Sequence, residues 1–123
     1  MTDSDRRRRG VQVFRRVYGE VLQTPVPPAG QNRSFDFMLE TLFGDLWCNE
    51  ILSFKERRLL VLGAIAAQGV DTAFAIHAES AVNNGEISVA QLQETLLFLI
   101  QYVGYPRASK LAGAVDAIAR KYG

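Results

Sequence analysis

Apolar residues recur at three- and four-residue intervals through most of this 123-residue chain. That spacing places them on one face of an α-helix, whereas a half-buried strand would alternate apolar and polar residues. The pattern covers residues 5–22, 34–47, 53–67, 71–82, 89–103 and 106–121. No convincing alternation occurs elsewhere, so the sequence predicts an all-α fold of about six helices.

Proline, glycine and polar caps separate these segments. Three of the four prolines lie between Thr24 and Gly30, where they favour an extended connection. Ser88 and Gln91 have the spacing of a capping box, and Asp71 is placed to cap the segment that follows it. Residues 59–67 are apolar on every side, which predicts that the helix containing them is central and buried.

The length fits a single domain, residues 1–123, with one core. One cysteine and one histidine exclude an internal disulfide, a Cys/His zinc module and an intramolecular dithiol cycle. We therefore expect no metal and no cofactor.

Positive charge is concentrated in four consecutive arginines, residues 6–9. Removing these four charges from the net charge of +1 leaves −3, which argues against a nucleic-acid-binding surface. We interpret the run as a solvated, partly frayed helix start. The start has no apolar signal core, and no stretch reaches the roughly 18 apolar residues of a spanning helix, so a cytoplasmic protein without a membrane partner is expected.

His77 has the side chain of greatest chemical interest, because its ordinary pKa lies near neutrality. It lies within the apolar run AFAIHAESA, where a partly desolvated imidazole could donate or accept a proton. A structural histidine, with one ring nitrogen bonded to a carbonyl in the core or at a subunit interface, fits the same pattern. The residues alone favour the structural interpretation.

Arg57 and Arg58 stand where the third segment becomes fully apolar. At least one of them must lie at the edge of the core, where it needs carboxylate or carbonyl partners or a path to water. A guanidinium beside a pocket could hold a substrate carboxylate through two parallel hydrogen bonds. An ion pair with Glu50, Glu56 or Glu79 is the alternative.

Trp47, Cys48, Asn49 and Glu50 form a short junction between helices, where functional groups are often displayed. Glu50 could act as a general acid or base, although the residues favour a solvated carboxylate. Cys48 is the one cysteine of the sequence, so no second thiol is available to it, and we interpret it as a small apolar residue that fills space.

Five motifs carry a family signature through their order and spacing. They are RRVYGEV from Arg15, FGDLW ending at Trp47, LSFKERRLLVLGAIAAQG from Leu52, IHAESAVNNGEIS from Ile76 and QETLLFLIQYVGYPRA from Gln93. With these motifs, the chain resembles the carboxymuconolactone decarboxylase family of the alkyl hydroperoxidase D-like superfamily from about Arg15 to Ala119.

The resemblance implies an all-helical fold that forms homotrimers or homohexamers, with active sites at subunit interfaces. It implies removal of CO2, without a cofactor, from a small carboxylated lactone in aromatic compound degradation. The family's catalytic histidine and arginine fall on His77, as proton carrier, and Arg57, as carboxylate or enolate clamp. Trp47 would line the pocket, and Glu50, Arg58 and Phe74 are the further substrate-binding candidates.

The superfamily also contains thiol peroxidases, whose two cysteines would fall on Val70 and Ala73 here. The decarboxylase branch tends to have Arg-Pro-Gly-Leu where this chain has the stretch 49–52, Asn-Glu-Ile-Leu, which would disfavour a polyanionic lactone. Two alternatives stay open: an antioxidant protein that uses Cys48 alone, and a catalytically silent oligomer that binds a small acid.

Overall fold

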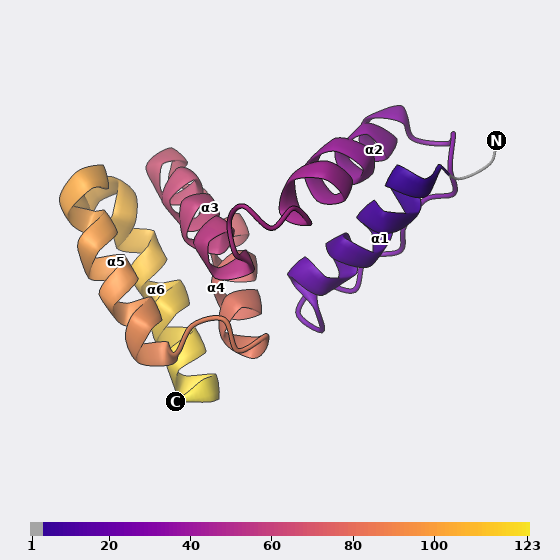
Figure 1. Ribbon diagram of the computed structural model, residues 1–123. Helices are drawn as coiled ribbons and strands as arrows, with labels where there is room; N and C mark the ends of the chain where they lie inside the picture. Colours follow the sequence, from indigo (N-terminus) through magenta and orange to yellow (C-terminus); the bar gives the residue numbers. More distant parts are fainter. Residues whose placement is uncertain (1–3) are drawn as a thin grey trace. The chain divides into compact units, whose positions relative to one another are not determined.

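The computed structural model describes residues 4–123, and the regular structure in that range is entirely helical (Figure 1). The all-α prediction is confirmed. The chain forms two compact units, residues 1–53 and 54–123. The N-terminal unit contains α1 (Asp5–Tyr18), α2 (Arg33–Phe37) and the π-helix η1 (Met38–Trp47), and the C-terminal unit contains α3 (Phe54–Gln68), α4 (Asp71–Asn83), α5 (Val89–Val103) and α6 (Tyr105–Tyr122).

In the N-terminal unit, α1 packs against η1 through small residues and aromatic rings. A Cβ atom added at Gly10 would lie 1.8 Å from the carbonyl oxygen of Leu39, so the two backbones approach too closely there for any side chain. Next to this crossing, the rings of Phe14 and Phe43 pack edge to face with centroids 5.2 Å apart. Glycine at position 10 is therefore a requirement of this packing.

Two helices of this unit differ from the sequence prediction. The first ends at Tyr18 and not at residue 22, because Gly19 adopts φ 53°, outside the helical range, and donates its N–H to the carbonyl of Arg15. The second, predicted as one α-helix from 34 to 47, begins as α2 and continues as the π-helix η1.

The arginine run is more than a solvated helix start. Arg7 is 5% exposed, and its guanidinium donates to Asp36 Oδ1 at 2.7 Å and to the carbonyl of Pro27 at 2.6 Å. The predicted solvated state is therefore wrong for Arg7, although the other three arginines of the run are exposed. The contacts tie the start of α1 to the proline-containing connection and to α2.

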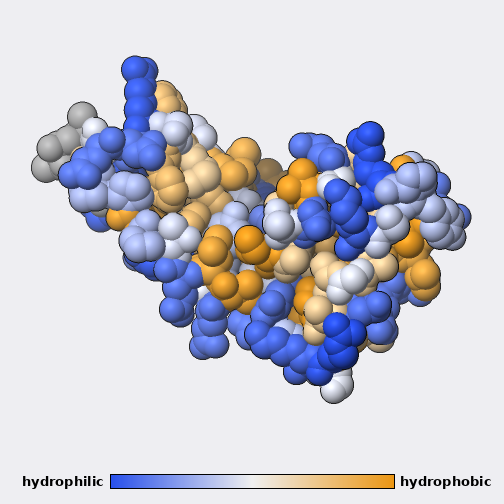
Figure 2. Space-filling model, turned by 180° about the vertical axis from the view of Figure 1, so that it is seen from behind, coloured by the Kyte–Doolittle hydropathy of each residue, from blue (hydrophilic) through white to orange (hydrophobic). Residues whose placement is uncertain are grey.

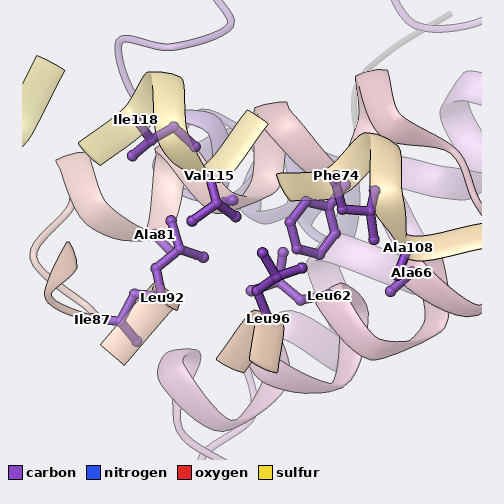
Figure 3. Packing of buried hydrophobic residues seen from close by; sticks show 12 residues of the cluster. Leu62, Ala66, Phe74, Ala81, Ile87, Leu92, Leu96, Ala108, Val115 and Ile118 are labelled. Atoms are coloured by element: carbon purple, nitrogen blue, oxygen red, sulfur yellow. The ribbon is translucent and has the colours of Figure 1, made fainter. Parts of the chain in front are cut away.

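The core of the C-terminal unit is built from all four of its helices (Figure 3). The buried residues are Leu62, Ala66, Phe74, Ala78, Ala81, Ile87, Leu92, Leu96, Ala108, Leu111, Val115 and Ile118. Burial of α3 is one-sided, because Leu60 is 64% exposed, so the prediction of a helix buried all round is wrong. Hydrophobic residues also reach the surface of the molecule (Figure 2). On α5, the exposed large side chains are Leu97, Phe98 and Tyr102.

The caps of this unit follow the sequence in one case and not in another. Ser88 and Gln91 form the predicted capping box, with Ser88 Oγ accepting from the Gln91 N–H at 3.0 Å. Asp71 does not cap α4, because Val70 occupies the cap position and Asp71 is already the first helical residue. Among the described helices, none combines the length and the apolar character needed to cross a membrane.

Candidate functional site

His77 lies in the middle of α4 and is 9% exposed. Its ring nitrogen Nδ1 is 2.9 Å from Nη1 of Arg58 on α3. A guanidinium nitrogen can only donate a hydrogen bond, so Nδ1 must be the acceptor and carry no proton. The neutral ring then has its proton on Nε2.

Arg58 is fully buried and forms a two-point ion pair with Glu86. Its Nε donates to Glu86 Oε1 at 2.8 Å and its Nη2 donates to Oε2 at 2.9 Å. Such parallel bonds fix the plane of the guanidinium as well as its position. We call Arg58, His77 and Glu86 the Arg–His–Glu cluster.

The turn between α4 and α5 places Glu86. Gly85 has φ 75°, a conformation that favours glycine, and the next N–H, that of Glu86, donates to the carbonyl of Ala81 at 2.9 Å. The Glu86 side chain is 10% exposed. The turn therefore directs its carboxylate back onto α3, against Arg58.

The surroundings of His77 disfavour its protonated form. Burial, followed by the positive charge of Arg58, lowers the pKa of His77 from 6.5 to about 4, and the negative charge of Glu86 opposes this shift only in part. Arg58 and Glu86 balance each other, so a proton on His77 would add an unpaired positive charge. The histidine is therefore neutral at physiological pH.

A second polar contact on α4 involves Glu79, two residues after His77 and thus on the opposite side of the helix. Glu79 accepts from Lys121 at 2.8 Å and from the Tyr122 hydroxyl at 2.9 Å, and these bonds lower the pKa of its carboxyl. Of the carboxylates proposed from the sequence as arginine partners, Glu79 thus bonds to α6. Glu86, which the sequence reasoning missed, is the partner of Arg58.

The other predicted site residues lie in different surroundings. Arg57 is half-buried on α3, next in sequence to the arginine that contacts His77. Phe74 is fully buried in the core of the C-terminal unit, one turn before His77. Trp47, which is buried, and Glu50, which is exposed, both belong to the N-terminal unit.

Cys48, also in the N-terminal unit, is half-buried. Its Sγ donates to the carbonyl oxygen of Gly44 at 2.7 Å.

A cavity of about 470 Å³ opens between α3 and α5 in the C-terminal unit. Its lining residues are Lys55, Leu59, Ile87, Gln91, Glu94, Thr95, Phe98 and Leu99. Leu59 and Ile87 directly follow Arg58 and Glu86 in the sequence, so the wall of the cavity adjoins the Arg–His–Glu cluster along the chain. Its volume is in the range of small-molecule sites.

Among residues 4–123, no three His, Cys, Asp or Glu side chains are grouped so that they could hold a metal ion. The polar groups that the structure brings together are those of an arginine, a neutral imidazole and a carboxylate. Such a set can orient a substrate, donate hydrogen bonds and stabilise a developing negative charge.

Comparison with known proteins gives the same family as the motifs. The model of the carboxymuconolactone decarboxylase family matches residues 33–117, which include the whole Arg–His–Glu cluster. A nitrosuccinic acid decarboxylase from Metarhizium robertsii is 31% identical over 83 residues, which are 68% of this chain and 54% of that protein. This chain thus spans about half the length of that relative. With a family match across most of its length, this chain belongs to the carboxymuconolactone decarboxylase family.

Proposed function

We propose that this protein is a cofactor-independent decarboxylase of a small carboxylic acid. The family to which it belongs and the similarity to a nitrosuccinic acid decarboxylase support this reaction type. The observation that carries the proposal is the buried Arg–His–Glu cluster, which fixes one neutral imidazole away from bulk water.

The reaction sets the substrate class. Loss of CO2 leaves an electron pair on carbon, and that pair needs an adjacent group to receive it. In a carboxylated unsaturated lactone the carbonyl oxygen receives the pair, and in a nitro acid a nitro oxygen does. Both intermediates are oxyanions, so one site with a fixed hydrogen-bond donor would serve either substrate.

The residues divide this task between them. His77 faces the reacting group, and Arg57 holds the substrate carboxylate, as expected from the resemblance. Arg58 is a poor candidate for direct substrate binding, because its guanidinium is fully buried and bonded to Glu86 at two points. Phe74 is fully buried in the core and is a poor candidate for the same reason. The assignment of Trp47 and Glu50 to the substrate pocket stays a prediction from the resemblance.

Self-association is part of the proposal. The exposed apolar side chains Leu97, Phe98 and Tyr102 lie on α5, and apolar groups left on a surface favour contact with another copy of the chain. A homotrimer or homohexamer would cover them. The antioxidant alternative is less well supported, because Cys48 is half-buried and its Sγ is already bonded to the Gly44 carbonyl.

The test is CO2 release from two acids that differ in the group that receives the electron pair. Nitrosuccinate and 4-carboxymuconolactone are each incubated with the protein, and CO2 and the product are quantified. We expect turnover of at least one acid, and its loss in His77→Ala and in Arg57→Ala while the oligomer persists. Absence of CO2 release from both acids, or full activity of both variants, would contradict the proposal. Thermal stabilisation by an acid without CO2 release would instead identify a binding protein.

A further inference from the structure

The contacts of the His77 ring determine which of its two nitrogens carries the proton. We propose that Arg58 and Glu86 are positioning residues that hold His77 neutral with its proton on Nε2, so that His77 donates a hydrogen bond to the oxyanion formed on loss of CO2. The tautomer follows from the contact between Arg58 and His77, and only the last step rests on the proposed function.

The contact geometry excludes the other protonation states of the ring. At 2.9 Å, Arg58 Nη1 and His77 Nδ1 are at hydrogen-bond distance, and a guanidinium nitrogen can donate a hydrogen bond but cannot accept one. A proton on Nδ1 would point at another N–H group. The Nδ1–H tautomer and the imidazolium ion would therefore both break the contact.

Glu86 makes this arrangement rigid. With both carboxylate oxygens bonded to Nε and Nη2, the Arg58 side chain cannot rotate its third nitrogen away from His77 without losing the ion pair. Because Arg58 is fully buried, a lost hydrogen bond would leave its donor without water as a replacement partner, which costs free energy.

The charges around α4 agree with a neutral ring. Arg58 contacts His77 from α3, and the carboxylate of Glu86, in the turn before α5, acts on it electrostatically. On the α6 side, Lys121 and Tyr122 are bonded to Glu79. Burial and the charge of Arg58 lower the pKa of His77 to about 4, which supports the geometric argument.

This role differs from that of the proton carrier expected from the resemblance. When the bond between carbon and the carboxylate breaks, its electron pair moves into the carbonyl or nitro oxygen and CO2 leaves. The new oxyanion accepts a hydrogen bond from Nε2 of His77, which keeps its proton. Water then protonates the carbon as the pair returns from oxygen, and the hydroxide that remains combines with CO2 to give bicarbonate.

The single histidine makes the tautomer directly observable, because every imidazole signal comes from His77. In the ¹⁵N-labelled full chain, two-bond ¹H–¹⁵N spectra at pH 7 should show a protonated Nε2 and an unprotonated, hydrogen-bonded Nδ1. The pattern should persist as the pH falls from 8 to 5. A wild-type ring that is an imidazolium, or an Nδ1–H tautomer, at pH 7 would overturn the proposal.

Variants test whether Arg58 is responsible. In Arg58→Met the Nδ1 signal should move toward the average of the two tautomers, and the pKa of His77 should rise by about one unit or more, because a positive neighbour is lost and Glu86 remains. Arg57→Met removes the same charge one residue earlier and should leave the ring pattern unchanged. Equal changes in both variants would show that the direct contact does not control the ring.

A second pair of variants covers the case in which Arg58→Met fails to fold. Arg58→Met/Glu86→Leu removes both charges, which leaves no buried charge uncompensated, and it should also show averaged tautomers. Glu86→Gln keeps one acceptor and should weaken the Nδ1 hydrogen bond. An unchanged wild-type pattern in these folded variants would refute the positioning role.

Activity gives a separate readout. In folded Arg58 and Glu86 variants that release CO2, kcat should fall at least tenfold with a smaller change in KM, since the donor is needed in the transition state more than in substrate binding. If the protein releases no CO2 while the ring shows the predicted tautomer, the proposed function fails and the positioning of His77 stands.

Discussion

The burial of a neutral histidine predicts a specific loss of stability in mild acid. The pKa of His77 is about 4 in the folded chain and 6.5 when the residue is exposed to water. Between these values the unfolded chain binds a proton that the folded chain does not, so protonation favours unfolding. The contribution of His77 to stability is complete above pH 6.5 and is lost as the pH falls toward 4.

The size of the effect follows from the two pKa values. Proton linkage predicts that the free energy of unfolding decreases by about 2 kcal/mol between pH 7 and pH 5 because of His77 alone. That loss is a substantial fraction of the roughly 5–15 kcal/mol that stabilises a typical domain.

Urea denaturation at pH 7, 6 and 5 measures this loss, with His77→Gln as the matched control. Glutamine can accept the Arg58 hydrogen bond through its side-chain oxygen but does not titrate. The carboxylates common to both proteins cancel in the comparison, so wild type should lose about 2 kcal/mol more than the variant between pH 7 and pH 5. Equal losses in the two proteins would refute the reasoning, because His77 would then titrate in the folded chain as it does in water.

Two further predictions concern stability at pH 7. Glu86→Ala should lower the free energy of unfolding by about 3–5 kcal/mol, because it leaves a buried arginine without its partner. Glu79→Ala removes a partly exposed carboxylate and should lower it much less. Urea denaturation measures both losses, and equal losses would contradict the prediction. Gly10→Ala should cost about 2 kcal/mol or more, because its Cβ would overlap the carbonyl of Leu39. Gly113→Ala, on an exposed helix face with open space around it, should instead stabilise the protein by about 0.5–1 kcal/mol. Thermal unfolding measures both variants, and a higher Tm for Gly10→Ala than for Gly113→Ala would contradict the packing argument.

Most of the helices could be predicted, because local signals determine where they begin and end. The apolar period located each helical segment, and the capping box at Ser88 marked the start of α5 at the correct residue. The π-helical form of η1 could not be predicted, since its apolar residues suit an α-helix equally well.

The choice between Arg57 and Arg58 shows where sequence reasoning ends. Residues 59–67 are apolar on every side, so the pattern does not specify which face of α3 turns inward. In the structure, Arg58, Leu62 and Ala66 form the buried row, each four positions after the previous one. Packing against α4 and α6 determines how α3 is rotated about its axis. These contacts are between distant parts of the sequence, so the local sequence pattern does not predict them.

Glu86 was missed for a related reason. It lies 28 residues after Arg58, in a turn, and helical spacing rules do not connect the two positions. The Asn-Asn-Gly sequence before it predicted the end of α4, but the direction of the carboxylate depends on the left-handed conformation of Gly85. The histidine was found from the sequence, while the groups that orient it required the structure.

The pH dependence of CO2 release tests the central claim most directly, since it requires both a decarboxylation and a histidine that stays neutral. For wild type acting on nitrosuccinate or 4-carboxymuconolactone, we expect kcat/KM, corrected for the substrate's own ionisation, to be level between about pH 5.5 and 8, because a His77 pKa of about 4 lies below that range. A decline of about tenfold per pH unit above an inflection near 6.5, as for an imidazolium acid, would contradict the account. The absence of CO2 release from both acids would also contradict it.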